Sequence, residues 1–392
     1  MKKLKIAMVA ACPFPANRGT PSRILRMAEA LSGLGHCVCV ATYHFGTQTE
    51  TKDIEIHRIP RIPYYYYAPG PTLTKLGILD PLLFLKLFKI VKSKRIDLVH
   101  AHHFEGAIVG YAVRKLSGVR VLYDAHTTLK SELDSYGFFN ITSLSRFLDK
   151  KVPEWSDHVI AASDTLKVFL QGIGINRSKI DVIPTGVNPE HFEGKDPNAM
   201  RKRYRIGQSQ IVLYTGSLAN FQGIDYLIQA MKGVFEKRKN VALILVGNSN
   251  TDKIRDICLK NGILDKVIIT GERKFDEIPL FLASADVAVI PRIECPGIPQ
   301  KLTNYMAAQK AIVSFKGSAK LLIDEHNGLV VENGDTVAMA NSIITLLDNK
   351  DLRKKLGGNA KSTLVGTYDW STLCQRLEKI YFRLLGLEAR RG

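Results

Sequence analysis

Glycines follow predicted strands at two places where backbone amides could hold a phosphate group. Gly19 lies in the loop after the first apolar stretch, and Gly216 and Gly223 bound a loop at mid-chain. Each loop leads into a predicted helix, whose N-terminal amides and dipole favour negative charge. We interpret both loops as binding the diphosphate of a nucleotide. The alternative is that the glycines only permit tight turns between a strand and a helix.

A departing diphosphate also needs its charge neutralised, and fixed cations can do this. The sequence has no metal-ligand motif, so we predict no metal site and no cofactor. Lys301 is the first candidate for the required cation and Arg292 is the second. The alternative for each is a solvated surface charge.

Histidine at the end of a predicted strand is the remaining candidate for chemistry. His126 follows an apolar strand, and an imidazole there could bind a ligand or transfer a proton. A loop histidine bonded to the backbone is the alternative interpretation. His102 and His103 follow the preceding strand and are weaker candidates.

The elements that position these residues occur as the same unit twice. A strand at 5–11, a glycine loop, an amphipathic helix ending near Gly33 and a strand at 38–42 begin the chain. The pattern returns with a strand at 210–214 and another at 241–246. Strands that alternate with helices form parallel sheets, so the predicted fold class is α/β with two doubly wound, Rossmann-like domains. Further strands are expected at 97–101, 120–124, 158–161, 179–183, 266–270, 287–290, 311–314 and 328–331.

Length and composition agree with two cores. With 392 residues the chain exceeds one hydrophobic core, and the predicted domains are 1–188 and 189–370. No apolar run is long enough to cross a bilayer, and the basic, apolar N-terminus lacks a signal-peptide cleavage site. The six cysteines have no metal-site spacing and are expected to be reduced thiols. These features predict a cytoplasmic protein.

The net charge of +18 suggests an anionic partner. No nucleic-acid-binding motif accompanies the charge, so nucleic acid is not expected. The segment Leu82 to Arg95 combines apolar residues with Lys86, Lys89 and Lys92 and has no acid, which is typical of a helix on an anionic membrane surface. A buried helix with a solvated basic edge is the equal alternative. Peripheral attachment to the inner face of the plasma membrane therefore stays open.

Several short motifs share one order along the chain: Gly19-Thr20, Gly35-His36, Tyr123-Asp124-Ala125-His126, Tyr214-Thr215-Gly216-Ser217, Gln222-Gly223-Ile224-Asp225, the stretch 299–312 and Asn327-Gly328. In that order they resemble the retaining family-4 glycosyltransferases of the GT-B fold. The resemblance implies that the two Rossmann-like domains face each other across a cleft. It also implies that a last helix, 371–392, crosses back onto the first domain.

The chain departs from the family where charged residues are usual. The family has an arginine after the loop glycine and a lysine six residues on, and here Ser217 and Gln222 stand there. The second of two family glutamates is Asn304 here, with Pro296 eight residues earlier and Glu294 nearby. The predicted catalytic residues are His126 and Lys301. The predicted donor-binding residues are Gly19, Thr20, Gly216, Ser217, Gln222, Gly223, Gly247, Arg273, Glu294, Gly297 and Asn304.

The expected activity is transfer of a hexosyl group from a nucleotide-diphosphate sugar, first of all a UDP-sugar, to a glycan or lipid-linked acceptor. The resemblance implies retention, no metal ion, and a role in envelope or exopolysaccharide synthesis. Two alternatives stay open. A non-catalytic nucleotide-sugar-binding protein would explain Ser217, Gln222 and Asn304, whereas the order of motifs argues against a nucleotide-sugar epimerase.

Overall fold

The chain folds into two compact units. The computed structural model describes residues 2–16, 19–47, 53–63, 65, 75–135, 142–295 and 297–387. The first unit comprises 1–185 together with 370–392, and the second comprises 186–369. The sequence analysis placed the same divisions at 188 and 370. Each unit has one parallel sheet, so the predicted fold class of two Rossmann-like α/β domains is confirmed.

The sheet of the first unit has the strand order β3-β2-β1-β4-β5-β6-β7, and every neighbouring pair is parallel. β1, β4 and β5 are buried almost throughout, because strands covered by helices on both faces must be apolar on both. The strands are β1 (Lys5–Ala10), β2 (Cys37–Thr42), β3 (Ile54–Arg58), β4 (Leu98–His102), β5 (Arg120–Ala125), β6 (His158–Ala161) and β7 (Ile180–Val182).

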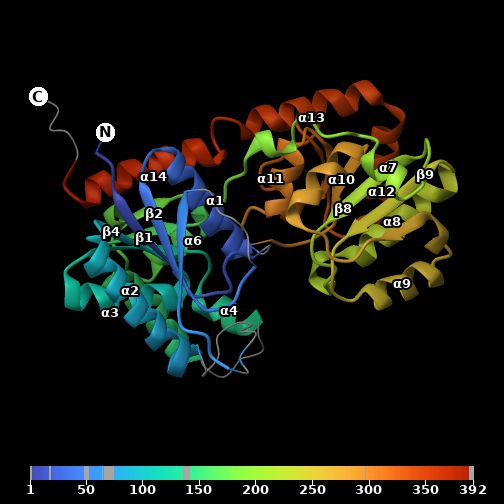
Figure 1. The fold of residues 1–392 in the computed structure, drawn as a ribbon. Helices are drawn as coiled ribbons and strands as arrows, with labels where there is room; N and C mark the ends of the chain where they lie inside the picture. The colour runs from blue at the N-terminus through green and yellow to red at the C-terminus, as the bar shows by residue number, and fades with distance from the viewer. Residues whose placement is uncertain are drawn as a thin grey trace, which may run out of the picture. The chain divides into compact units, whose positions relative to one another are not determined.

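Helices cover both faces of this sheet (Figure 1). One face packs against α1 (Gly19–Gly33) and α14 (Trp370–Leu384), so the last helix of the chain lies in the first core. The other face packs against α2 (Asp80–Lys94), α3 (His103–Ser117), α4 (Leu129–Ser135), α5 (Thr142–Trp155) and α6 (Asp164–Gly172).

The sheet of the second unit is parallel with the order β10-β9-β8-β11-β12-β13. Its strands are β8 (Gln210–Thr215), β9 (Val241–Val246), β10 (Val267–Ile269), β11 (Val287–Ile290), β12 (Ala311–Phe315) and β13 (Leu329–Val331). One face packs against α8 (Ile224–Lys237), α9 (Thr251–Lys260) and α12 (Thr336–Asp348). The other packs against α7 (Ala199–Arg203), α10 (Ile278–Ser284), α11 (Gln300–Ala307) and α13 (Lys350–Leu364).

Both sheets reverse their strand order at one point. In the first unit the chain builds outward from β1 to β3 and then crosses to β4 on the other side of β1. In the second unit it builds from β8 to β10 and crosses to β11. Ligands of open α/β sheets bind at the carboxyl ends of the strands beside such a reversal. The segments that matter therefore follow β1 and β4 in one unit and β8 and β11 in the other.

Strand β3 is the one strand of the described residues that the sequence analysis missed. Its sequence Ile54-Glu55-Ile56-His57-Arg58 is mostly polar, and it lies at the edge of the sheet, where one side needs no partner. Such a strand has no continuous apolar run to reveal it. Among the described residues, no helix is long and apolar enough to span a membrane.

Candidate functional site

Glycines in the second unit let backbone segments approach closely at the carboxyl edge of the sheet. Gly223 has φ +75°, and a Cβ there would lie 2.0 Å from the carbonyl oxygen of Pro291. A Cβ on Gly247 would lie 1.8 Å from the carbonyl oxygen of Gly216. Backbone packing alone therefore requires glycine at 223 and 247, as the turn interpretation proposed. Both residues nevertheless lie at the edge where a ligand would bind.

Lys301 reaches from α11 into the loop that follows β8. Its Nζ donates to Tyr214 Oη at 2.5 Å and to Gln222 Oε1 at 2.9 Å. The same Nζ would lie 3.0 Å from a Cβ on Gly216, which has φ +126°. The structure thus brings together Lys301, Gly216 and Gln222, three residues of the predicted donor site. The amine of Lys301 approaches the loop at Gln222, where the resemblance expects a lysine of the loop itself.

The ammonium of Lys301 has no negatively charged partner among the residues that the structure describes. Burial, with a smaller contribution from Arg292, lowers its pKa to about 7. Its hydrogen-bond acceptors, the Tyr214 hydroxyl and the Gln222 amide, are neutral. Within the described ranges no carboxylate forms an ion pair with it. A half-buried cation without such a counterion favours an anionic ligand, since an opposite charge offsets the cost of desolvation.

In the part of the chain that the structure describes, the other predicted donor-binding residues of this unit form no hydrogen bond with the Lys301 side chain, and Ser217 and Arg273 have partners of their own. Ser217 Oγ accepts from Ala219 N at 3.2 Å within the loop. Arg273 donates to the carbonyl oxygen of Thr270 at 2.8 Å, and its buried Nε has no hydrogen-bond partner among the described residues. Near α11, Glu294 is exposed and Gly297 is half-buried before the helix, and Asn304 is buried inside it. Pro296 lies outside the described residues.

In the first unit His126 lies close to Thr20 of α1. Its Nδ1 lies 3.2 Å from Thr20 Oγ1, and its Nε2 lies 3.4 Å from Asp124 Oδ2. Burial lowers the pKa of His126 to about 4 despite the nearby carboxylate, so the imidazole is neutral at pH 7. Gly19 begins α1, and a Cβ there would meet nothing within 4 Å. The structure therefore brings Thr20 and His126 together, and Gly19 precedes Thr20 at the start of α1.

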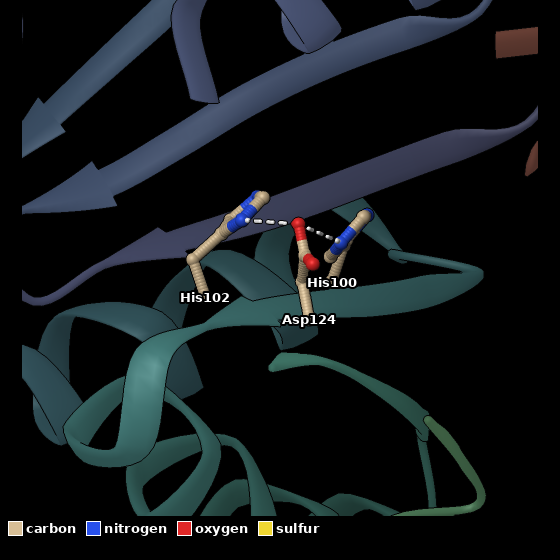
Figure 2. A group of neighbouring side chains, drawn as sticks. All are labelled: His100, His102 and Asp124. Carbon is tan, nitrogen blue, oxygen red and sulfur yellow. Dashed lines mark ion pairs between the residues drawn. The ribbon is translucent and has the colours of Figure 1, made fainter. Parts of the chain in front are cut away.

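Asp124, at the end of β5, organises the surroundings of His126. Arg23 of α1 donates to both carboxylate oxygens, at 3.0 and 3.1 Å. His102 Nδ1 lies 3.1 Å and His100 Nε2 3.7 Å from Asp124 Oδ2. Figure 2 shows both rings facing the carboxylate. Burial would raise the pKa of Asp124, but Arg23 and the histidines outweigh it and hold the pKa well below its usual range.

The last helix joins this buried group. Tyr381 Oη of α14 lies 2.5 Å from His100 Nδ1, and the guanidinium of Arg23 lies 5.7 Å from the ring centre of Trp370. His100, His102, Asp124 and Arg23 together are called the Asp124 cluster below. It connects α1, β4, β5 and α14 inside an otherwise apolar core.

The Asp124 cluster contains three side chains of metal-binding type, although the sequence predicts no metal site. The ligand atoms of His100, His102 and Asp124 all lie within 4.8 Å of one another. The carboxylate, however, is already neutralised by two hydrogen bonds from Arg23, and a metal ion would stand beside that guanidinium. These residues fit a buried ion pair better than a metal centre.

Sequence reasoning missed most of this cluster. His102 was named only as a weaker candidate, and Arg23 and His100 were not named. A signal was present, because His100, His102 and Asp124 are polar residues on one face of strands that are otherwise apolar. Polar side chains at buried strand positions are rare unless they are paired.

The predicted membrane segment turns its apolar side to the core. Leu83, Leu87, Ile90 and Val91 of α2 are buried, and Leu82, Phe84 and Phe88 pack against the same core. These residues cover the sheet, as in the alternative of a buried helix with a solvated basic edge. The remaining exposed stripe contains Leu85, 59% exposed, with Lys89 and Lys92, while Lys86 is half-buried.

Comparison with known families decides the identity of the chain. Residues 18–191 match the family model described as Glycosyltransferase Family 4, and residues 209–349 match that of Glycosyl transferases group 1. The chain belongs to the family-4 glycosyltransferases. The sequence-based recognition of this family is confirmed, and the chain is a glycosyltransferase of that type.

Known proteins are similar to this glycosyltransferase over most of its length. A GDP-mannose-dependent alpha-(1-6)-phosphatidylinositol monomannoside mannosyltransferase of Mycobacterium tuberculosis is 24% identical, with 82% of each chain covered. Sucrose-phosphate synthase from Thermosynechococcus elongatus has a TM-score of 0.80 at 20% identity, covering 98% of this chain and 100% of that one. The HepE protein of Anabaena, in complex with UDP and glucose, has a TM-score of 0.77 at 19% identity and covers 96% and 99%. The two structures establish the GT-B fold.

Proposed function

We propose that this glycosyltransferase transfers a hexosyl group from a nucleotide-diphosphate sugar, first of all a UDP-sugar, to a hydroxyl group of a glycan or lipid-linked acceptor, with retention and without a metal ion. The observation that carries the proposal is the uncompensated ammonium of Lys301 beside the glycine loop after β8. Envelope or exopolysaccharide synthesis is the proposed context.

The diphosphate is the part of the donor that this site suits. Lys301 supplies a cation, and the backbone amides after β8 lead into α8, whose N-terminal dipole favours an anion. The site is on the second unit beside its strand-order reversal. HepE, with the same fold, binds UDP and glucose, which supports a nucleotide sugar here.

The transfer step needs charge stabilisation more than a protein nucleophile. In the proposed reaction the acceptor oxygen bonds to the anomeric carbon, the bond from that carbon to the diphosphate breaks, and the hydroxyl proton passes to the departing diphosphate. Lys301 would stabilise the charge that develops on that diphosphate, in the place where other enzymes use a metal ion. The Thr20–His126 pair would orient a hydroxyl group of the sugar or the acceptor.

A ligand screen tests the proposal directly. Thermal unfolding of the full chain is followed with UDP-, GDP-, ADP- and dTDP-sugars, since a ligand of the folded state raises the apparent stability. We expect a UDP-sugar to raise the melting temperature, and release of UDP in the presence of a hydroxyl acceptor to continue in EDTA. Stabilisation without transfer to any acceptor would support the non-catalytic alternative. The family matches favour a glycosyltransferase over the epimerase alternative.

The membrane proposal rests on the exposed stripe of α2. Lys89 and Lys92 are exposed next to Leu85, and anionic lipid attracts each basic residue by about 1 kcal/mol. We expect the protein to sediment with vesicles that contain anionic lipid at low salt, and less at high salt. Replacing Lys89 and Lys92 by Glu should abolish sedimentation. Equal sedimentation with neutral vesicles would contradict electrostatic attachment. If the attachment is electrostatic, the proposed location is the cytoplasm, at the inner face of the plasma membrane.

A further inference from the structure

Two polar contacts join α1 to the end of β5 in the first unit. Thr20 Oγ1 lies 3.2 Å from His126 Nδ1, and Arg23 donates to both carboxylate oxygens of Asp124. Thr20 and Arg23 are three residues apart in α1, so they share one side of the helix. The side chains of Asp124 and His126, two residues apart at the end of β5, lie 3.4 Å from each other. The two contacts therefore fix how the imidazole faces the carboxylate.

The Asp124 carboxylate can only accept hydrogen bonds at pH 7. Burial would raise its pKa, but Arg23 and the surrounding histidines hold the pKa well below its usual range. An ionised carboxylate has no proton to donate, so it attracts a nitrogen that carries a proton and repels one that presents a lone pair. His100 and His102 each turn one nitrogen toward this carboxylate (Figure 2). The carboxylate therefore selects which nitrogen of each neighbouring imidazole is protonated.

His126 turns Nε2 toward the carboxylate and Nδ1 toward Thr20. Within the described ranges Nε2 forms no hydrogen bond, so the carboxylate acts on this nitrogen through its charge. Burial lowers the pKa of His126 to about 4, so the ring is neutral at pH 7 and carries one proton. With that proton on Nε2, Nδ1 keeps its lone pair and accepts from the Thr20 hydroxyl at 3.2 Å. The oxygen of Thr20 then has lone pairs left for a ligand.

We propose that Asp124 is a positioning residue, which holds His126 in the tautomer protonated on Nε2 and thereby directs the Thr20 hydroxyl hydrogen to Nδ1. His126 is 11% exposed, whereas Asp124 is closed to solvent, so Asp124 reaches a ligand only through His126 and Thr20. A carboxylate behind an imidazole sets the orientation and tautomer of the ring in this way in catalytic triads and metal sites. The proposal rests on the proposed function and adds that the ligand group at Thr20 must bring its own hydrogen, as a hydroxyl does.

The tautomer of His126 can be measured in the full-length protein without any ligand. In protein with isotope-labelled histidine, nitrogen–proton correlation NMR at pH 7 distinguishes ring nitrogens that carry a proton from those that do not. The signals of His126 are identified as those that disappear in His126→Gln. We expect the proton on Nε2 and a hydrogen-bonded lone pair on Nδ1. A wild-type protein with the proton on Nδ1 overturns the proposal.

Asp124→Asn tests whether the carboxylate sets this tautomer. An amide can both accept and donate, so the variant should show His126 protonated on Nδ1 as well. The matched control is Asp181→Asn, because Asp181 Oδ2 faces His158 Nε2 at 2.9 Å in the same sheet. This control should change the signals of His158 and leave those of His126 as they are. His126 signals that stay the same in Asp124→Asn contradict the proposal. If Asp124→Asn does not fold, the wild-type spectrum and the Thr20 variants give the answer.

Two variants of Thr20 test the direction of its hydrogen bond. Thr20→Val keeps the shape of the side chain and removes the hydroxyl, whereas Thr20→Ser keeps the hydroxyl. In Thr20→Val the Nδ1 signal of His126 should move to that of a lone pair without a donor, while the proton stays on Nε2. In Thr20→Ser both signals should stay near their wild-type positions. An Nδ1 signal that does not move in Thr20→Val shows that Thr20 does not donate to it.

Kinetics on the same samples separate this proposal from the proposed function. Release of UDP is followed with the UDP-sugar that stabilises the chain, and UDP affinity is measured in parallel. Thr20→Val should lower kcat about tenfold or more at unchanged UDP affinity and melting temperature, and Thr20→Ser should restore kcat. Wild-type turnover in Thr20→Val refutes the role of the pair toward a ligand. If no UDP-sugar binds or reacts, the proposed function fails, and the NMR spectra still decide whether Asp124 sets the tautomer.

Discussion

Both units place ionisable side chains at the carboxyl edge of a parallel sheet. The two units differ in whether these side chains have partners of opposite charge. In the first unit Asp124 is buried with Arg23 and neutral histidines, so the charge is balanced inside the core. In the second unit Lys301 is half-buried and donates to a phenol and an amide. The balanced cluster serves the fold, whereas the unbalanced cation is suited to a ligand that brings the missing charge.

The largest effect should come from removing the balancing charge of the first unit. Asp124→Asn leaves the Arg23 guanidinium buried without its carboxylate, which should cost about 3–5 kcal/mol of unfolding free energy. Hydrogen exchange resolves the units, and protection should fall in β4 and β5 but not in β8 and β9. Asp164→Asn, on the exposed start of α6, is the matched control. A loss of protection spread equally over both sheets would break the comparison.

Acid should weaken the first unit selectively. The folded pKa of His126 is about 4, below the unfolded value of about 6.5, so the unfolded chain binds more protons between these pH values. The stabilisation is complete above pH 6.5 and is lost as the pH falls to 4, at about 3 kcal/mol in total. The lowered pKa values of His100 and His102 act in the same direction.

His103 opposes this change only near and above pH 6.5, where its raised pKa keeps it protonated in the folded state while the unfolded chain loses the proton. Well below pH 6.5 it is protonated in both states and has no effect. Hydrogen exchange of β4 and β5 at pH 7, 6 and 5 measures the effect. Equal protection at pH 7 and pH 5 would show that the buried histidines carry no such penalty.

Removing the unbalanced cation should affect binding and not stability. Lys301→Met replaces a half-buried ammonium that has no counterion among the described residues by an apolar chain of similar length, a change that is often neutral or stabilising for the fold. Loss of a charged hydrogen-bond donor should weaken UDP binding about 10- to 100-fold. Calorimetric titration with UDP measures this affinity, and an unchanged dissociation constant would remove Lys301 from the donor site.

The pH dependence of UDP binding tests whether the charge of Lys301 is needed for the ligand. Above pH 7 the free amine of Lys301 loses its proton, and the bound diphosphate requires that proton. Affinity of the wild type should therefore fall about tenfold for each pH unit above 7, with proton uptake on binding. The Lys301→Met variant should lose this slope.

The smallest effect should come from the link between α14 and the Asp124 cluster. Tyr381→Phe removes one hydroxyl and leaves His100 Nδ1 buried without that partner, at a cost of about 1–2 kcal/mol. Protection should fall in α14 and β4. The control is Tyr111→Phe, at a ring that stacks on Trp155. Identical behaviour of the two variants would show that the hydroxyl of Tyr381 does not support the cluster.

Local patterns were enough to predict the framework of both units. Every described strand except β3 overlaps its prediction, because apolar runs and turn glycines recur along the chain at the spacing of strand, helix and strand. The same order placed Gly216, Gly223 and His126 at strand ends. The stretch 299–312, which carries part of the family resemblance, contains α11 and the start of β12, and that strand was predicted at 311–314.

The sequence by itself determined the alternating elements, the family and the edge at which ligands meet each sheet. Only the tertiary structure decided which charges are balanced. Lys301 meets Gln222 across 79 positions, Arg23 meets Asp124 across 101, and Tyr381 meets His100 across 281. Local periodicity encodes which side of an element is buried, but not which distant side chain it meets there. The pairing depends on strand order and helix docking, and these arise only when the whole unit has folded.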